Sequence, residues 1–377
     1  MKEFIKSIEP RIMEIFHHLH SHAEISWQEY QTTEYLTQLL ELEGVRVKTF
    51  DDHTGLIGEM GNGKPVVALR ADIDALWQEV NGTFQANHSC GHDAHMTMAL
   101  GVLFVLKKFY PKPNGTIRFI FQPAEEKGTG ALKMVEKGVV DDVSYLYGMH
   151  LRPFQEIPDG TAVPSILHGG ARFVSGKIKS DDAHGARPHL GQNAIEIGAN
   201  FVSFLNSIHI DPMQSYSAKM TAFQAGGESS NIIPGSATFS LDLRAQNNDT
   251  MEELQKKVDG IGQYLANYYG VDLSLEIDAS VAAAEVSLEA QEKMKASIID
   301  VLGEEKCYSP LVTTGGDDFH FYTIKRPHLK ATMLGIGCDL APGLHHPNMT
   351  FNHKAMLTGI EILAKTIIKT VEGEGTA

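Results

Sequence analysis

Four side chains that commonly bind transition metals lie within eight residues, from His88 to His95. Cys90 and His92 are one residue apart in an expected turn, so they could reach a shared ion. Thiolate and imidazole are the usual ligands of zinc and its neighbours. A buried cysteine beside helix-capping histidines is the simpler alternative. Further candidate ligands downstream favour the interpretation as a metal site.

Three more candidate ligands follow strand-like runs: Glu126, His150 and His345. With Cys90 and His92 they make five, too many for one open tetrahedral site but suited to two ions that share a thiolate bridge. Two such ions, roughly 3.5–4 Å apart, can hold a water between them and lower its pKa. For His150 or His345 taken alone, a hydrogen-bonded core histidine is the simpler interpretation, and His346 competes with His345.

Two further carboxylates could support the chemistry. Glu125 adjoins Glu126, and in the bend set up by Pro123 one can bind metal while the other stays free. A metal-assisted hydrolase needs a free carboxylate as its general base, although an exposed charged pair is the simpler alternative. Asp72 could accept a hydrogen bond from a ligating imidazole, or it could serve as a helix N-cap or turn residue.

A second group of polar residues lies later in the chain. His184, in a glycine-containing loop, could polarise a carbonyl group. Asn231 and Arg244 could bind an anionic part of a substrate, since a guanidinium group pairs with a carboxylate through two hydrogen bonds. A solvated loop for His184 and a strand-end salt bridge for Arg244 remain open.

Composition limits the class of protein. The chain has 377 residues, enough for two domains, and its 42% hydrophobic and 21% charged content is typical of globular proteins. A formal net charge of −15 disfavours nucleic acid or an anionic membrane as partner. No apolar run reaches the ~20 residues of a membrane span, and no signal-peptide core follows Met1. Three cysteines give no disulfide framework, which predicts a cytoplasmic location.

The first part of the chain alternates strand and helix. Helices are expected at 10–20, 32–43, 96–109 and 131–137, and strands at 66–69, 116–121 and 145–149. This alternation predicts an α/β fold with a mainly parallel sheet covered on both faces. Ligands bind beyond the carboxyl ends of such strands, where we expect Asp72, Glu125, Glu126 and His150.

The pattern changes after Gly170. Segments 172–179, 193–208, 217–224, 236–245, 251–269 and 271–277 follow the order β-α-β-β-α-β of a ferredoxin-like unit. We expect 170–280 to be an inserted domain within a discontinuous metal-binding domain, 1–169 and 281–377. After the insertion, the metal-binding domain is expected to resume with a helix at 290–302, a strand at 331–336 and a last helix at 354–371. Residues 373–377 are expected to be a frayed tail.

Seven motifs together carry a family resemblance. They are Arg70-Ala-Asp-Ile-Asp-Ala-Leu76, Cys90-Gly-His-Asp-Ala-His95, Gln122-Pro-Ala-Glu-Glu126, Gly148-Met-His150, His184-Gly-Ala-Arg-Pro-His189, Asn231-Ile-Ile-Pro234 and Leu344-His-His-Pro347. Spread in order over nearly the whole chain, they resemble the amidohydrolase branch of the aminoacylase and carboxypeptidase-G-like dinuclear metallopeptidases. That branch includes hippurate hydrolases, indoleacetyl-amino-acid hydrolases and N-acetyl-amino-acid deacetylases.

The resemblance implies a zinc-peptidase-like domain with an inserted lid and dimerisation domain. It assigns two divalent ions (Mn, Zn, Co or Ni) to Cys90, His92, Glu126, His150 and His345. It implies roles for Glu125 as general base, for His184 at the scissile carbonyl, and for Asn231 and Arg244 at the substrate carboxylate. We also expect a catalytic role for Asp72 and a substrate-binding role for Gly316. Asp317, where relatives have a glutamate, and extra residues before Phe351 depart from the family pattern.

We therefore expect a metal-dependent amidohydrolase that cleaves the amide of N-acyl amino acids through a metal-bridged water. A dipeptidase or aminopeptidase with the same site is an alternative, as is a non-catalytic amino-acid-binding protein. A homodimer through the inserted domain is expected, because its sheet edge needs covering and two-fold pairing is the commonest closure. The acyl group, the side chain accepted, the metal, the pathway and whether His184 acts in its own subunit stay open.

Overall fold

The computed structural model describes residues 1–374, which divide into two compact units. The first comprises Met1–Leu167, Glu285–Val312 and the chain from Asp318 onward. The second comprises His168–Ala284 and Thr313–Asp317, so the predicted insertion, 170–280, falls inside it. Its assignment as a lid and dimerisation domain stays a prediction.

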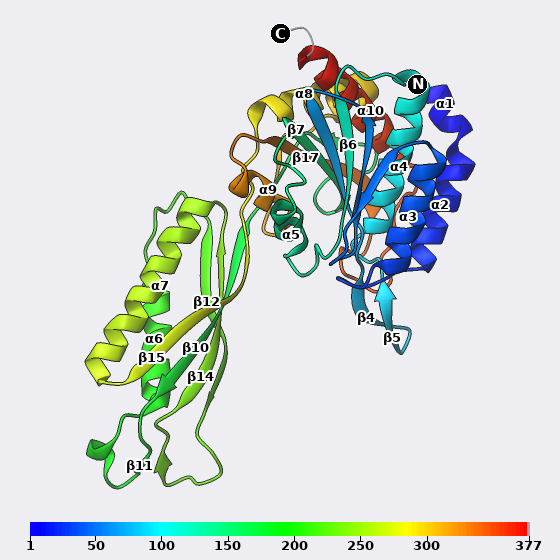
Figure 1. The fold of residues 1–377 in the computed structure, drawn as a ribbon. Coiled ribbons are helices and arrows are strands. Elements are labelled where there is room, and N and C mark those ends of the chain that lie inside the picture. Colours follow the sequence, from blue (N-terminus) through cyan, green and yellow to red (C-terminus); the bar gives the residue numbers. More distant parts are fainter. Residues whose placement is uncertain (375–377) are drawn as a thin grey trace. The chain divides into compact units, whose positions relative to one another are not determined.

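The first unit is built on a sheet whose seven strands, within residues 1–374, run in the order β1-β2-β6-β3-β7-β17-β8 (Figure 1). Their bounds are β1 Arg46–Thr49, β2 Leu56–Gly61, β6 Thr116–Gln122, β3 Val66–Asp72, β7 Tyr145–Pro153, β17 Lys330–Leu340 and β8 Ala162–Val163. Strands β6, β3, β7 and β17 pair in parallel, while the pairings at both edges are antiparallel. The predicted mainly parallel sheet is confirmed.

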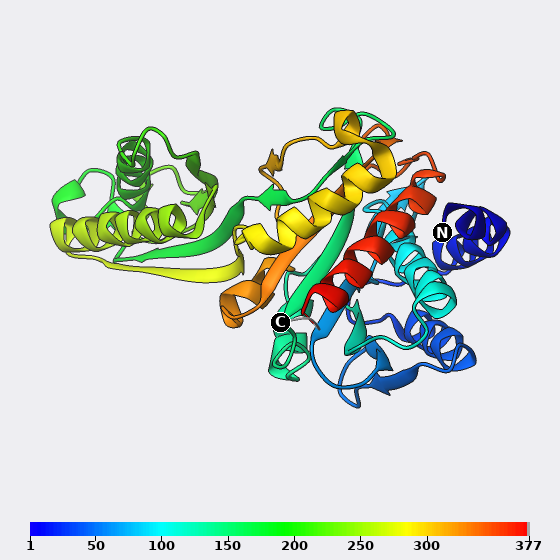
Figure 2. The ribbon, with the colours of Figure 1, turned by 90° about the horizontal axis from the view of Figure 1, so that it is seen from above.

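Helices cover both faces of this sheet. On one side α4 (His92–Phe109), α10 (Ala355–Glu374) and α8 (Leu288–Leu302) lie in a row (Figure 2). Tyr147 of β7 hydrogen-bonds Thr370 of α10, whereas the next residue, Gly148, faces Phe319 at the start of α9 (His320–Lys325). Because successive strand residues point to opposite faces, α9 covers the other side. The remaining helices of this unit are α1 Lys2–Ser7, α2 Glu9–Ser21, α3 Tyr30–Leu42 and α5 Gly130–Glu136.

Some predicted boundaries near the site are wrong. Helix α4 begins at His92 rather than Met96, and His150 lies inside β7 rather than at its end. Both errors arise because these polar side chains are buried, so the apolar runs end before the elements do. The hairpin of β4 (Leu76–Val80) and β5 (Thr83–Asn87) was not predicted at all, since it carries few buried residues.

The second unit contains the strands and helices in the predicted β-α-β-β-α-β order. They are β10 Gly170–Lys179, α6 Ala194–Asn206, β12 Tyr216–Ala225, β14 Ala237–Ala245, α7 Asn248–Tyr269 and β15 Asp272–Val281. The sheet order β12-β14-β10-β15 is antiparallel throughout, as in a ferredoxin-like unit. Both helices pack on one face, around Phe201, Phe239 and Leu254.

Short strands complete the structure: β9 Ile166–His168, β11 Ala183–His184, β13 Ile232–Ile233 and β16 Leu311–Thr313. The expected frayed tail, 373–377, begins instead within α10, and 375–377 lie outside the described residues. Within residues 1–374 no helix has both the length and the apolar character that crossing a membrane requires.

Candidate metal centre

Cys90 lies at the centre of the candidate site. Its buried Sγ atom is 3.6 Å from His150 Nε2. Two sets of possible ligands include this sulfur, one with His92 and His150 and the other with Glu126 and His345. Within each set the ligand atoms lie within 4.8 Å of one another. The thiolate is therefore positioned to be shared by two ions.

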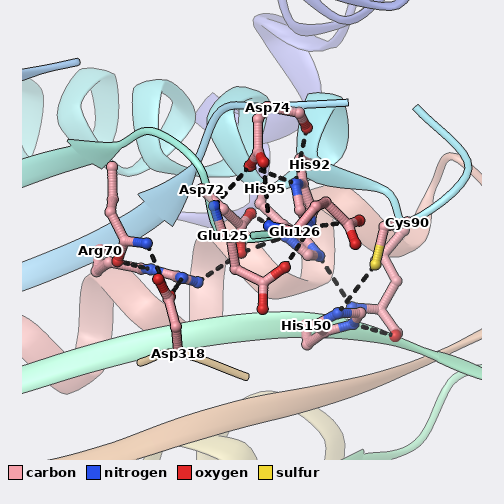
Figure 3. A network of polar contacts seen from close by, with 12 residues as sticks. Arg70, Asp72, Asp74, Cys90, His92, His95, Glu125, Glu126, His150 and Asp318 are labelled. Carbon is pink, nitrogen blue, oxygen red and sulfur yellow. Dashed lines mark hydrogen bonds and ion pairs between the residues drawn. The ribbon is translucent and has the colours of Figure 1, made fainter. Parts of the chain in front are cut away.

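His92 is oriented by the backbone of the loop after β3. Its Nδ1 donates to the carbonyl oxygen of Asp74 at 2.8 Å, which leaves Nε2 facing the two glutamates (Figure 3). Nε2 is 3.8 Å from Glu125 Oε2 and 3.8 Å from Glu126 Oε1, and it has no hydrogen-bond partner among residues 1–374. A buried imidazole nitrogen in this state is suited to a metal ion.

His150 is oriented in a similar way from β7. Its Nδ1 donates to the carbonyl oxygen of Leu151 at 2.7 Å, so the lone pair of Nε2 faces Cys90. Burial holds the pKa of His150 well below its ordinary value. The ring is therefore neutral, the form in which histidine binds metals.

Glu125 and Glu126 follow β6 in a loop that is held by a buried carboxylate. Asp74 accepts the backbone N–H of Glu125 at 3.1 Å and that of Glu126 at 3.0 Å. The loop turns at Ala124, whose φ of 52° is left-handed. The two adjacent carboxylates both lie on the side of His92 Nε2. The expected division between one metal-binding and one free carboxylate stays a prediction.

The two candidate histidines His345 and His346 have different surroundings in the structure. His345 Nε2 lies 3.5 Å from Glu126 Oε2, and its backbone N–H donates to the carbonyl oxygen of Ser89 at 2.8 Å. His346 instead accepts a hydrogen bond at Nδ1 from the backbone of Asn348. Among the described residues it joins no set of possible ligands.

Asp72 hydrogen-bonds a histidine that the sequence did not single out as a ligand. Its Oδ1 is 2.7 Å from Nδ1 of His95, whose Nε2 accepts the backbone N–H of Leu151. Asp72 also pairs with the buried Arg70, which in turn bonds Asp318 (Figure 3). The expected bond from Asp72 to a ligating imidazole therefore goes to His95, while Asp74 orients His92.

Asp74 and His95 are the site residues that sequence reasoning missed. The sequence contains a spacing pattern that could have identified each of them. Asp74 is two residues beyond Asp72 in an extended segment, and His95 is three beyond His92, which places both histidines on one face of a helix.

The side chains fit divalent cations. Their donors are one sulfur, three imidazole nitrogens and carboxylate oxygens, a combination that suits zinc-like ions. Glu126 Oε1 is buried without a hydrogen-bond partner in residues 1–374. Burial raises the pKa of Glu126 to about 7, and raises that of Cys90 well above its ordinary value. Positive charge at this point would stabilise both anions, since metal ions bind the deprotonated forms.

The predicted carbonyl-polarising residue belongs to the second unit. His184 Nδ1 accepts the backbone N–H of Ala186 at 3.0 Å, which leaves a proton on Nε2 of the exposed ring. The short ladder of β11 and β13 brings His184 close to Asn231, because Gly185 N–H donates to the carbonyl oxygen of Asn231 at 2.8 Å.

Arg244 and Gly316 also lie in the second unit. Arg244 is on β14, where it pairs with Asp242 at 2.7 Å and lies over the ring of Phe173 at 5.2 Å. This is the salt bridge that the sequence left open as an alternative. A Cβ added at Gly316 would come 3.0 Å from Val281. The substrate-binding roles of Asn231, Arg244 and Gly316 stay predictions.

The chain is similar in sequence and in fold to known proteins. The profile of peptidase family M20/M25/M40 matches residues 68–369. N-acetylcysteine deacetylase of Bacillus subtilis (strain 168) is 29% identical, over 97% of this chain and 98% of its own. IAA-amino acid hydrolase ILR1-like 4 of Arabidopsis thaliana is 30% identical, over 81% of this chain and 72% of its own. The crystal structure of Bacillus subtilis YXEP, a dinuclear metal binding peptidase, superposes with a TM-score of 0.82 at 26% identity, covering 97% of this chain and 99% of that one.

Proposed function

The chain belongs to peptidase family M20/M25/M40, and from this we propose that it is a metal-dependent amidohydrolase that releases amino acids from N-acyl amino acids. The observation that carries the proposal is the position of Cys90, which is common to two sets of possible metal ligands beside the carboxylate of Glu125. The names of the deacetylase and the indoleacetyl-amino-acid hydrolase support the substrate class.

We assign two divalent ions to five ligands. Cys90 would be common to both, His92 and His150 would complete one set of ligands, and Glu126 and His345 would complete the other. Bound there, such ions would lower the pKa of a water and polarise the amide carbonyl. Manganese, zinc, cobalt and nickel all remain candidates, because the set mixes sulfur, nitrogen and oxygen donors.

Glu125 is the proposed general base. Its Oε2 lies near His92 Nε2, and its side chain is 11% exposed, so it is accessible to a water and a substrate. Oε2 takes the proton from the attacking water and passes it to the leaving nitrogen of the amide. Asp72 holds the ring of His95 by a hydrogen bond, and this ring packs beside the metal ligands.

The second unit supplies the proposed substrate contacts. The Nε2–H of His184 donates to the carbonyl oxygen as negative charge develops on it. Asn231, Arg244 and Gly316 bind the free carboxylate end of the substrate, and Arg244 must exchange Asp242 for it. We further propose a homodimer through this unit and a cytoplasmic location, the latter supported by three free thiols.

A dipeptidase is the second candidate function, favoured by the description of YXEP as a peptidase. The deciding experiment is a panel of N-acetyl, N-benzoyl and indoleacetyl amino acids beside dipeptides with free amino groups. Each substrate is assayed with added Mn²⁺, Zn²⁺, Co²⁺ or Ni²⁺. The proposal expects higher kcat/KM for an N-acyl amino acid than for every dipeptide, and the reverse order would favour the dipeptidase.

A further inference from the structure

Buried carboxylates bind three consecutive backbone N–H groups in the loop 124–126. Ala124 N–H donates to Glu29 Oε1 at 2.9 Å. The next two N–H groups, those of Glu125 and Glu126, donate to the two carboxylate oxygens of Asp74. The backbone that carries the proposed base is therefore held at every residue, and one of the three hydrogen bonds comes from Glu29, which is 95 positions away in sequence.

Glu29 occupies an unusual place for a carboxylate. It is the N-cap residue of α3, yet its side chain makes no capping hydrogen bond to that helix. The carboxylate points instead into the interior, where it is 0% exposed and accepts the hydroxyl of Thr54 at 2.5 Å as well as the amide of Ala124. Burying a carboxylate costs free energy that a helix cap at the surface would avoid.

The amide that Glu29 binds belongs to the strained residue of the loop. Ala124 has φ of 52°, a left-handed conformation that alanine rarely adopts without support. The turn is also closely packed from the other side. A Cβ added at Gly55, next to Thr54, would lie 2.6 Å from Pro123 Cδ. Glu29 and Thr54–Gly55 thus hold the turn from two directions.

We propose that Glu29 is a positioning residue that holds the left-handed turn at Ala124, and through it aims the carboxylate of Glu125 at the attacking water. Ala124 directly precedes Glu125, so a change in the backbone torsions of Ala124 would turn the peptide group that carries the N–H of Glu125 and would swing the Glu125 side chain. Glu126 lies one residue further on, and its own N–H is held by the other oxygen of Asp74. A displacement of about 1 Å can cost about 100-fold in rate. The inference rests on the proposed function, because it assumes that Glu125 moves a proton.

The first test compares substitutions at Glu29. Glu29→Ala removes the acceptor for Ala124 N–H, and we expect kcat on an N-acetyl amino acid to fall about 10- to 100-fold. KM and the number of bound metal ions, measured by elemental analysis, should stay close to wild type. Glu29→Gln keeps an oxygen that can accept the same N–H, so it should retain most of kcat. The side chain in Glu29→Asp is one methylene shorter, so kcat should fall to a value between those of Glu29→Gln and Glu29→Ala. This variant replaces Glu29→Ala in the test if Glu29→Ala does not fold.

The second test relieves the strain itself. Glycine adopts a left-handed φ without penalty, so Ala124→Gly should raise the kcat of Glu29→Ala several-fold while changing the wild-type enzyme little. Glu24→Ala is the matched control. Glu24 comes from the same segment, but its carboxylate accepts backbone N–H groups of α3 at Gln31 and Thr32. Its loss should lower thermal stability without lowering kcat.

Several results would overturn the inference. An unchanged kcat in Glu29→Ala, an equal loss in Glu29→Gln, or an absence of rescue by Ala124→Gly would each do so. A fall in metal content that parallels the fall in kcat would place the effect on Glu126 instead. Failure of the proposed function would look different from failure of the proposed role of Glu29, because the wild-type protein would then hydrolyse no N-acyl amino acid at all.

Discussion

Glu125 and Glu126 are neighbours in sequence, but the structure gives them different surroundings. Glu126 faces His345 and the sulfur of Cys90, and its buried Oε1 has no hydrogen-bond partner within residues 1–374. Glu125 is near His92 but, among the described residues, belongs to no set that contains Cys90. One side chain is thus suited to hold metal and the other to accept a proton.

Isosteric substitution separates these roles. Glu125→Gln should bind two metal ions yet lose kcat by about 100-fold or more, because an amide cannot take the proton from water. Glu126→Gln should lose metal, since it loses an anionic ligand. Elemental analysis and initial rates on the same preparations would measure both effects. Exchanged phenotypes would mean that the two roles are reversed.

Glu29 gives a prediction about stability and pH. Burial raises its pKa from the ordinary 4.5 to about 7, so the folded state holds this proton more tightly than the unfolded chain does. The free energy of unfolding should therefore fall as pH rises from about 4.5 through 7, by about 3 kcal/mol from this group. Glu29→Gln has no titrating carboxyl group at this position, so its free energy of unfolding lacks this pH-dependent fall.

Urea unfolding of wild type and Glu29→Gln in chelating buffer, at a series of pH values, would measure the contribution of Glu29 to the free energy of unfolding. The stability of the variant relative to wild type should increase between pH 4 and pH 8. Parallel pH profiles for the two proteins would show that Glu29 titrates in the folded state as it does in the unfolded chain.

At the scale of elements, the sheet of the second unit presents Arg244 on β14 in an ion pair with Asp242. Because a guanidinium binds carboxylate through two hydrogen bonds, Arg244→Ala should raise KM for N-acyl amino acids by ~10-fold or more. The corresponding amides, which lack that carboxylate, should be nearly unaffected. Steady-state kinetics on matched acid and amide substrates would test this.

Arg172→Ala is the control for that experiment. Arg172 is on β10 of the same sheet and pairs with Glu252 of α7, so its loss should not distinguish the two substrates. Equal losses on acid and amide in Arg244→Ala would mean that Arg244 serves the sheet rather than the substrate.

The elements also show what the sequence could predict. Apolar runs such as Val66–Leu69 and the β-α-β-β-α-β order are local patterns, so the sheet and the ferredoxin-like unit were predicted correctly. The start of α4 at His92 and the interior position of His150 were not, because burial of polar side chains depends on long-range contacts. The bond of Asp74 to the loop 124–126 joins residues about fifty positions apart and has no local signature.

At the scale of the whole molecule, we predict a homodimer in which His184 acts on the active site of the other subunit. His184 and the candidate metal ligands belong to different compact units. His184→Ala and Glu125→Gln should each be inactive, and after subunit exchange their heterodimer should regain part of the activity. Light scattering would verify assembly. No recovery in purified heterodimers would assign His184 to its own subunit's site, and a monomer would exclude the arrangement.

If the chain holds two divalent ions on a shared Cys90 and hydrolyses N-acyl amino acids with them, metal content and activity must rise and fall together. Elemental analysis gives the metal content, and the rate of N-acetyl amino acid hydrolysis is measured on the same samples. Chelated wild-type protein should be inactive and should recover fully as metal is restored to two equivalents per chain. Cys90→Ser should bind little metal and recover little activity, because a hydroxyl is much harder to deprotonate than a thiol. Full metal occupancy in Cys90→Ser would rule out Cys90 as the shared ligand, and undiminished hydrolysis by the chelated wild-type protein would rule out a role for the ions in catalysis.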